Sequence, residues 1–332
     1  MRLLQDWLVD SVPGFEPPAA VRRMGVGQSN ITSLIEDSGG HSWVLRHPPP
    51  GSHDPSAHDV HREARVLSAL DGSPVPVPAV IATGSNEAGI TTAFYVMQRV
   101  PGVVLASEDE AEGLSGSERL RVSDDVLGVL AALHAIRPDE IGLGDLGRTE
   151  GYLERQIVRT ARSWDEWGKE SKAAVVWERC RTRLAARMPA QQRTVIVHGD
   201  YRLSNLLVEA GKVTAVLDWE LCTLGDPLAD LAWLVDDWRS PLEPAIAIPS
   251  PTRVGGFHDR EHLIAEYGQM TGLDVSEIGY YRAFTHWKAA TLLQGVLLRR
   301  RTARRDTSPS ESELETTIET LLDEALELMS IG

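Results

Sequence analysis

One short segment limits the possible folds of this chain more than any other. An apolar stretch at 195–197 ends just before Asp200, and Asn205 follows where a second apolar stretch begins. A third apolar stretch, 213–217, leads directly into Asp218. Short runs of β-branched and aliphatic residues that end in turn residues predict β-strands. We therefore expect strands whose ends bring Asp200, Asn205 and Asp218 together.

These three side chains have the chemistry that phosphoryl transfer requires. Mg²⁺ takes oxygen ligands and is usually held by one or two carboxylates together with phosphates, which suits Asn205 and Asp218. The remaining carboxylate, Asp200, can accept the proton of a hydroxyl nucleophile, as the loop aspartate of kinases does. Asp, Asn and Gly are also ordinary turn residues, so a purely structural origin is the competing interpretation. The pattern of the N-terminal half favours the functional one.

The first hundred residues have the pattern of a β-rich lobe. Short strands are expected at 31–36, 42–46, 80–84 and 93–98. Residues 37–40, Asp-Ser-Gly-Gly, form a typical hairpin turn, and an amphipathic helix is expected near 60–67. After Pro101-Gly102 helical periods dominate. We therefore predict an N-lobe over 1–100 and a C-lobe over 101–332.

Charge and composition narrow the range of partners. The 332 residues include 33 Lys and Arg against 48 Asp and Glu, which gives a net charge of −15. Such an acidic chain is a poor ligand for nucleic acids and anionic membranes, which attract basic surfaces. Asp6 and Asp10 stand where a signal peptide would be apolar, and the two cysteines make no disulfide framework. We expect a soluble, cytoplasmic protein that binds neither nucleic acid nor membrane.

The combination of His198-Gly199-Asp200, Asn205 and Asp218-Trp219 resembles the aminoglycoside phosphotransferase family of small-molecule kinases. The resemblance covers nearly the whole chain. It implies an α+β, two-lobed protein-kinase-like fold with a small β-rich N-lobe and a larger, mostly helical C-lobe. It also implies transfer of the γ-phosphate of ATP or GTP to a small-molecule hydroxyl group, with Asp200 as the catalytic base and Asn205 and Asp218 as Mg²⁺ ligands.

The resemblance also implies a phosphate-covering loop near the start of the N-lobe. Gly25, Gly27, Ser29 and Asn30 occupy the position of that loop, where glycines let backbone N–H groups approach phosphates. Asn30 stands where the protein-kinase loop has its third glycine, so we expect Ser29 or Asn30 to supply a polar contact instead.

Other nucleotide contacts are assigned by position. Arg46 replaces the phosphate-binding lysine of kinases, and a guanidinium can bind phosphate oxygens bidentately. Glu63 matches the helix glutamate that would orient Arg46. The backbone groups of Gln98 to Val100 are expected to hydrogen-bond adenine in the segment between the lobes.

Three further residues are assigned to structural support. His198 precedes the loop aspartate, and Asp226 and Asp230 lie in a segment that follows the Asp-Trp motif in the family. We expect Asp226 and Asp230 to brace the catalytic loop and to cap a helix.

The acceptor is less constrained than the nucleotide. Residues 44–51, 152–156 and 292–296 resemble the branch related to the kinase-like domain that is fused to some acyl-CoA dehydrogenases. That branch favours a hydroxyacyl-CoA-like acceptor, whereas the acidic C-lobe would suit a cationic aminoglycoside. Trp164, Trp167 and Trp177 are expected on one helical face, in the core or beside the acceptor.

Two functions of other classes remain open. A nucleotide-binding pseudokinase would be a regulatory module, although it would have no reason to keep Asp200, Asn205 and Asp218 together. A metal-dependent phosphohydrolase would use His198, Asp200 and Asp218 as ligands and would release phosphate from esters without nucleotide. It would leave the glycines of the loop at 25–30 unexplained.

Overall fold

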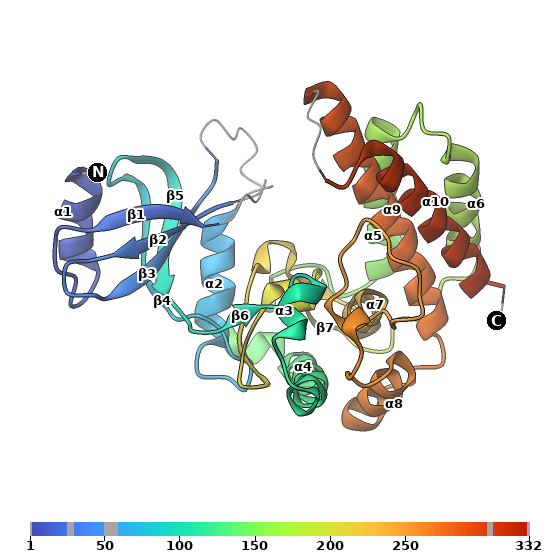
Figure 1. Cartoon of the computed structure of the whole chain (residues 1–332), viewed down its shortest axis with the longest axis horizontal. Helices are drawn as coiled ribbons and strands as arrows, with labels where there is room; N and C mark the ends of the chain where they lie inside the picture. Colours follow the sequence, from blue (N-terminus) through green and yellow to red (C-terminus); the bar gives the residue numbers. More distant parts are fainter. Residues whose placement is uncertain (1, 25–29, 50–58, 304–307, 331–332) are drawn as a thin grey trace.

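The computed structural model describes the whole chain except residues 1, 25–29, 50–58, 304–307 and 331–332. A lobe built on one sheet is followed by a larger lobe built mainly of helices (Figure 1). The predicted two-lobed, kinase-like α+β fold is confirmed.

The N-lobe is one antiparallel sheet with the strand order β1-β2-β3-β5-β4. Its strands are β1 (Ala20–Met24), β2 (Ile31–Glu36), β3 (Ser42–His47), β4 (Val80–Glu87) and β5 (Ile90–Gln98). Its helices are α1 (Arg2–Ser11) and α2 (Val60–Leu70). The sequence analysis did not predict α1 or β1. The latter is a mostly exposed edge strand with two arginines and no apolar alternation.

Alternate side chains of this sheet enter two different cores, because successive residues of a strand point to opposite faces. Leu45 and Val96 lie with Leu8 of α1 in a small cluster on one face. Val44 and Met97 belong to the main core, together with the apolar side of α2. Helix α2 therefore lies between the sheet and the C-lobe, as Figure 1 shows, and it can connect the two lobes.

The C-lobe is mainly helical. Its helices are α3 (Glu108–Glu112), α4 (Gly116–Ala135), α5 (Tyr152–Trp167), α6 (Ala174–Ala186), α7 (Pro227–Asp237), α8 (Arg260–Thr271), α9 (Ile278–Ala303) and α10 (Glu311–Leu328). Its strands are β6 (Val103–Val104), β7 (Val195–Val197), β8 (Leu206–Glu209), β9 (Lys212–Val216) and β10 (Thr223–Gly225). Short 3₁₀ turns lie at Pro138–Ile141, Leu203–Asn205, Trp219–Leu221 and Pro251–Val254. No helix in the described part of the chain has the length and apolarity needed to cross a membrane.

Small β-structures place the functional segment. The hairpin of β8 and β9 pairs Leu206 with Val216, and the Leu217 N–H donates to the Asn205 carbonyl oxygen at 2.8 Å. This pairing sets Asn205 beside the start of the Asp218 turn. Asp218 itself has φ +64°, a left-handed conformation that is uncommon for a residue other than glycine and often marks a functional position.

The expectation that the three tryptophans share one helical face is wrong, whereas a core position is confirmed for Trp164 and Trp177. Trp164 lies in α5, which ends at Trp167, and Trp177 lies in the separate helix α6. The three residues therefore share no helical face. Trp164 and Trp177 are buried and stack with their ring centroids 4.6 Å apart, as part of the main core. Spacing alone misled here because Gly168 ends the helix between them.

Candidate functional site

Asp200 follows β7, and neutral donors hold both of its carboxylate oxygens. The Asn205 amide nitrogen donates to Oδ2 at 2.7 Å and to the Asp200 carbonyl oxygen at 2.9 Å. The Trp233 indole nitrogen, from α7, donates to Oδ1 at 2.7 Å. Because neither donor is charged, the carboxylate is oriented while its own charge is kept. Such an oriented anion can accept a proton.

The backbone before Asp200 is fixed by the buried carboxylate of Asp230. It accepts the N–H groups of His198 and Gly199 at 2.7 and 2.8 Å, and it lies 3.3 Å from a ring nitrogen of His134. Burial by itself would raise the pKa of Asp230, but the contact with His134 and these backbone donors hold it below its usual value. Gly199 has φ +85°, and a Cβ there would lie 2.9 Å from the Leu221 carbonyl oxygen. The turn therefore requires glycine.

Asp226 supports the same region from the start of α7. It is the N-cap of that helix and accepts the Leu228 N–H at 3.1 Å, while the Tyr281 hydroxyl donates to its other oxygen at 2.7 Å. Burial raises its pKa above the usual value. These contacts fix the end of α7 from which Asp230 and Trp233 reach the loop.

Asp218 is held by charge rather than by neutral donors. Arg46, from β3, places its Nη2 atom 2.5 Å from Oδ1 of Asp218 and its Nε atom 2.9 Å from Oε2 of Glu63. Glu63 is buried in α2, and burial raises its pKa to about 7 although Arg46 acts in the opposite direction. One arginine thus joins a strand and a helix of the N-lobe to the C-lobe.

A cavity of about 180 Å³ lies between these groups. Its wall includes Thr32, Arg46, Tyr95, Met97, Asn205 and Asp218. The amide nitrogen of Asn205 faces Asp200, so its amide oxygen points away from that carboxylate. An amide oxygen and a carboxylate are the hard donors that Mg²⁺ prefers, and the donor set of Asn205 and Asp218 fits this ion.

His198 has no room to act as a metal ligand. It is fully buried, with Nε2 at 2.9 Å from the Leu217 carbonyl oxygen and Nδ1 accepting the Asp200 N–H at 3.2 Å. Both ring nitrogens are therefore used within the protein. This removes the imidazole ligand that the phosphohydrolase alternative requires.

Some of the nucleotide residues predicted from sequence lie within the described part of the chain and others do not. Gly25, Gly27 and Ser29 lie outside the described residues. Asn30 is buried, and neither polar atom of its side chain has a hydrogen-bond partner among the described residues. The Gln98 N–H donates to the Ala79 carbonyl oxygen at 2.8 Å, so it is engaged within the protein.

A second cavity of about 180 Å³ opens beside Trp233. One side is apolar and comes from Ile246, Ile248, Ala289, Leu292, Leu293, Val296 and Leu321. The other side is charged. Arg202 donates to Asp237 at 2.8 Å, and burial raises the pKa of Asp237 to about 6, with the Arg202 charge opposing the rise and the Asp200 charge adding to it.

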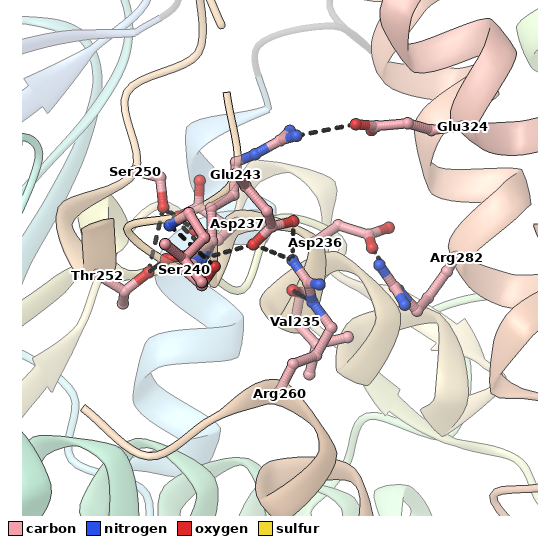
Figure 2. A network of polar contacts seen from close by, with 12 residues as sticks. Val235, Asp236, Asp237, Ser240, Glu243, Ser250, Thr252, Arg260, Arg282 and Glu324 are labelled. Carbon is pink, nitrogen blue, oxygen red and sulfur yellow. Dashed lines mark hydrogen bonds and ion pairs between the residues drawn. The ribbon is translucent and has the colours of Figure 1, made fainter. Parts of the chain in front are cut away.

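A network of partly buried ion pairs continues from this charged side (Figure 2). Arg282 contacts Asp236 at 2.7 Å and Arg260 contacts Glu243 at 3.0 Å. The network ties α7 to α8 and α9 and keeps the charged wall of the cavity in place. The cavity is therefore amphipathic, and its polar end lies toward Asp200.

Sequence reasoning missed Trp233, the second donor to Asp200. Its signal was its place three residues after Asp230 in the same helix, because residues three apart face the same way. Once Asp230 is expected to brace the loop, Trp233 becomes a candidate for contact with it. Tertiary packing alone shows that the indole nitrogen reaches the carboxylate.

Comparisons with known proteins find relatives of two kinds, longer proteins and proteins of similar length. A model described as "Phosphotransferase enzyme family" matches residues 20–270. Acyl-CoA dehydrogenase family member 10 of Mus musculus is 32% identical over 307 residues, 89% of this chain and 28% of that protein. Acyl-CoA dehydrogenase family member 11 of Rattus norvegicus is 33% identical over 311 residues, 90% of this chain and 39% of that protein. The chain thus spans well under half the length of these relatives.

Other matches have nearly the same length as this chain. Aminoglycoside 3'-phosphotransferase of Escherichia coli is 30% identical over 254 residues, 73% of this chain and 81% of that protein. The crystal structure of a candidate aminoglycoside phosphotransferase from Ralstonia eutropha has a TM-score of 0.82 at 30% identity and covers 99% of this chain and 98% of that one. Aminoglycoside phosphotransferase APH(4)-Ia, in complex with AMP-PNP and hygromycin B, has a TM-score of 0.62 at 17% identity, with 96% and 98% covered, and shows the fold alone.

Proposed function

The chain belongs to the phosphotransferase enzyme family, and we propose that it transfers the γ-phosphoryl group of ATP or GTP to a hydroxyl group of a small molecule. The observation that carries this proposal is the pair of neutral hydrogen bonds, from Asn205 and Trp233, that orient the Asp200 carboxylate. In this proposal Asp200 positions the acceptor hydroxyl and takes its proton. Catalysis then depends on alignment and charge neutralisation, without a covalent enzyme intermediate.

We propose that the cavity between the lobes receives the nucleotide phosphates. Asn205 and Asp218 would hold Mg²⁺, which neutralises phosphate charge when bound. Arg46, oriented by Glu63, would contact phosphate oxygens, and the loop at 25–30 would cover them. Asp218 now pairs with Arg46 at 2.5 Å, so nucleotide binding would require Arg46 to share or leave this carboxylate. The side chain of Asn30, buried without a partner among the described residues, is a candidate phosphate contact.

The adenine contacts follow as a narrower proposal. The N–H of Gln98 is already bonded to Ala79, so within the predicted segment from Gln98 to Val100 we assign the base to the backbone groups around Val100. We also propose residues 1–100 as the nucleotide lobe and 101–332 as the catalytic and acceptor lobe.

The acceptor is proposed to enter the amphipathic cavity beside Trp233. An aminoglycoside is polar and polycationic, and the apolar wall formed by residues such as Leu292 and Leu293 gives it no partner. A hydroxyl compound with an apolar part, such as a hydroxyacyl-CoA, would bury that part there. The names of the acyl-CoA dehydrogenase relatives point the same way, although this chain matches under half of those proteins.

The test is nucleotide consumption with Mg-ATP or Mg-GTP against two acceptor pools, aminoglycosides and hydroxyacyl-CoAs, with Asp200→Asn as the blank. We expect turnover with the hydroxyacyl-CoA pool and none in the blank. Turnover with aminoglycosides alone would overturn the assignment of the acceptor but not of the reaction. A wild-type protein that binds no nucleotide would overturn the kinase proposal.

The pseudokinase alternative predicts a different pattern. Mg-ATP would bind, yet wild type and Asp200→Asn would consume it equally slowly with every acceptor. We favour the enzyme because a regulatory module gains nothing from two hydrogen bonds aimed at a catalytic carboxylate.

A further inference from the structure

Lys288 in α9 contacts the same group that orients Asp200. Its ammonium nitrogen lies 4.5 Å from the centroid of the Trp233 ring and 3.4 Å from the Gly199 carbonyl oxygen. A cation over an indole face is attracted by the ring quadrupole. Lys288 therefore contacts both the indole that bonds to Asp200 and the residue directly before Asp200.

The electrostatic surroundings of Lys288 agree with this contact. Burial lowers the pKa of Lys288, the negative charges of Asp200 and Asp230 act against that shift, and the positive charge of Arg159 adds to it. Lys288 is half-buried and forms no ion pair with a carboxylate of the described residues. Its contacts are instead the face of the Trp233 ring and the Gly199 carbonyl oxygen. Both groups are uncharged, so Lys288 can hold them in place and keep its own positive charge.

We propose that Lys288 and Trp233 form a positioning pair for Asp200. Lys288 fixes the plane of the indole ring, and the indole N–H in turn fixes Oδ1 of the carboxylate at 2.7 Å. The inference rests on the proposed function for its catalytic consequence, but the contact itself can be measured without any acceptor.

The chain offers conservative variants for this test. Lys288→Met removes the charge and keeps the length, Lys288→Arg keeps the charge, and Trp233→Phe removes the N–H and keeps a ring. Lys172→Met is the matched control, because Lys172 is exposed and its ion pair, with Glu315 at 3.4 Å, lies on the surface. Trp7→Phe is the matched aromatic control in the N-lobe, where Trp7 contacts Phe94.

The first readout is the indole region of a ¹H–¹⁵N spectrum of the full chain, which holds nine tryptophans. The Trp233 signal is the one that Trp233→Phe removes and that Asp200→Asn shifts. We expect Lys288→Met to shift this signal and to speed exchange of its proton about tenfold, whereas Lys288→Arg and Lys172→Met leave it in place. An unchanged Trp233 signal in Lys288→Met would overturn the pairing.

The second readout is ADP release from Mg-ATP with water as the acceptor. Losing a hydrogen bond to a charged group should lower kcat about ten- to a hundredfold in Trp233→Phe, with nucleotide affinity unchanged. Lys288→Met should lower kcat as well, and the two effects should combine less than additively because both act through one bond. Fully additive losses would mean that Lys288 acts independently of Trp233. If wild type binds no Mg-ATP, the proposed function fails, while the spectrum still decides the pairing.

Discussion

The two carboxylates on which the proposed chemistry depends are held in opposite ways. Asp200 receives two neutral hydrogen bonds, from Asn205 and Trp233, whereas Asp218 is held by the guanidinium of Arg46. A neutral donor orients an anion and leaves its charge available, which suits a proton acceptor. An ion pair satisfies the anion but can be exchanged for another cation, which suits a metal ligand. The kind of partner therefore separates two side chains of the same type.

The largest effect is expected for a change at Asp200, the carboxylate held by neutral donors. Asp200→Asn should lower turnover about a thousandfold or more, because the proton acceptor is lost, while Mg-ATP affinity stays within about twofold. Steady-state turnover and calorimetric binding check this. Asp145→Asn is the matched control, since Asp145 is exposed and pairs with Arg65 on the surface. Turnover that survives in Asp200→Asn would remove the distinction between the two carboxylates.

A change at Asp218, the carboxylate held by an ion pair, should alter nucleotide affinity more than the rate of phosphoryl transfer. Asp218→Asn should weaken nucleotide affinity about tenfold or more in the presence of Mg²⁺ and change it little in EDTA, because the lost group is proposed to act through the ion. Calorimetry with and without Mg²⁺ measures the difference. An equal loss in both conditions would mean that Asp218 acts on the nucleotide through Arg46 and not as a metal ligand.

The sequence located the three polar side chains of the proposed site, but not all of the partners that orient them. Asp200 and Asp218 were singled out because each comes after an apolar strand, and Asn205 because it directly precedes one, a pattern that local residues determine. Trp233 and Lys288 lie in helices whose periodicity predicts a buried face but not which atom a side chain meets. Such contacts depend on how α7 and α9 pack against the loop, and no local pattern contains that information.

The same reason explains the other errors and gaps. Strand β1 was missed because its burial is low and its register comes from β2 alone. The tryptophans of α5 and α6 share a spacing that fits one helix, but a glycine ends the first helix before the second begins. Strands with a continuous apolar run were predicted, whereas β1, whose pairing with β2 defines it, was not.

A third carboxylate, Asp237, extends the comparison, because its burial should make the stability of the protein depend on pH. Burial raises its pKa to about 6 in spite of Arg202, so the folded protein binds a proton more tightly than the unfolded chain, whose aspartates have pKa values near 3.8. This contribution to stability is full below about pH 4 and is lost as the pH rises to about 6. Asp237→Asn should remove this decrease in stability between about pH 4 and pH 6.

Urea unfolding of Asp237→Asn and wild type between pH 4 and 7.5 measures the effect. The free energy of unfolding of the variant relative to wild type should increase by up to about 3 kcal/mol across this range, at about 1.4 kcal/mol for each pH unit between the two pKa values. Asp145→Asn should show no such increase, because the hydrogen bond from Arg65 lowers the pKa of Asp145 instead of raising it. A parallel pair of curves for Asp237→Asn would mean that Arg202 fully compensates the buried charge.

The smallest effect is expected at the apolar wall of the acceptor cavity, and its sign distinguishes two acceptors. Leu292 is 42% exposed, so Leu292→Glu should be tolerated in the fold. A carboxylate there repels an anionic acyl-CoA and removes apolar contact, so KM for a hydroxyacyl-CoA should rise about fivefold. The same change attracts a cationic aminoglycoside and should lower its KM by a similar factor. Leu292→Gln is the matched control, because it removes the apolar contact without adding charge. If KM for the acyl acceptor is the same in wild type, Leu292→Glu and Leu292→Gln, this cavity does not bind the acceptor. The different partners of Asp200 and Asp218 would then say nothing about where the acceptor binds.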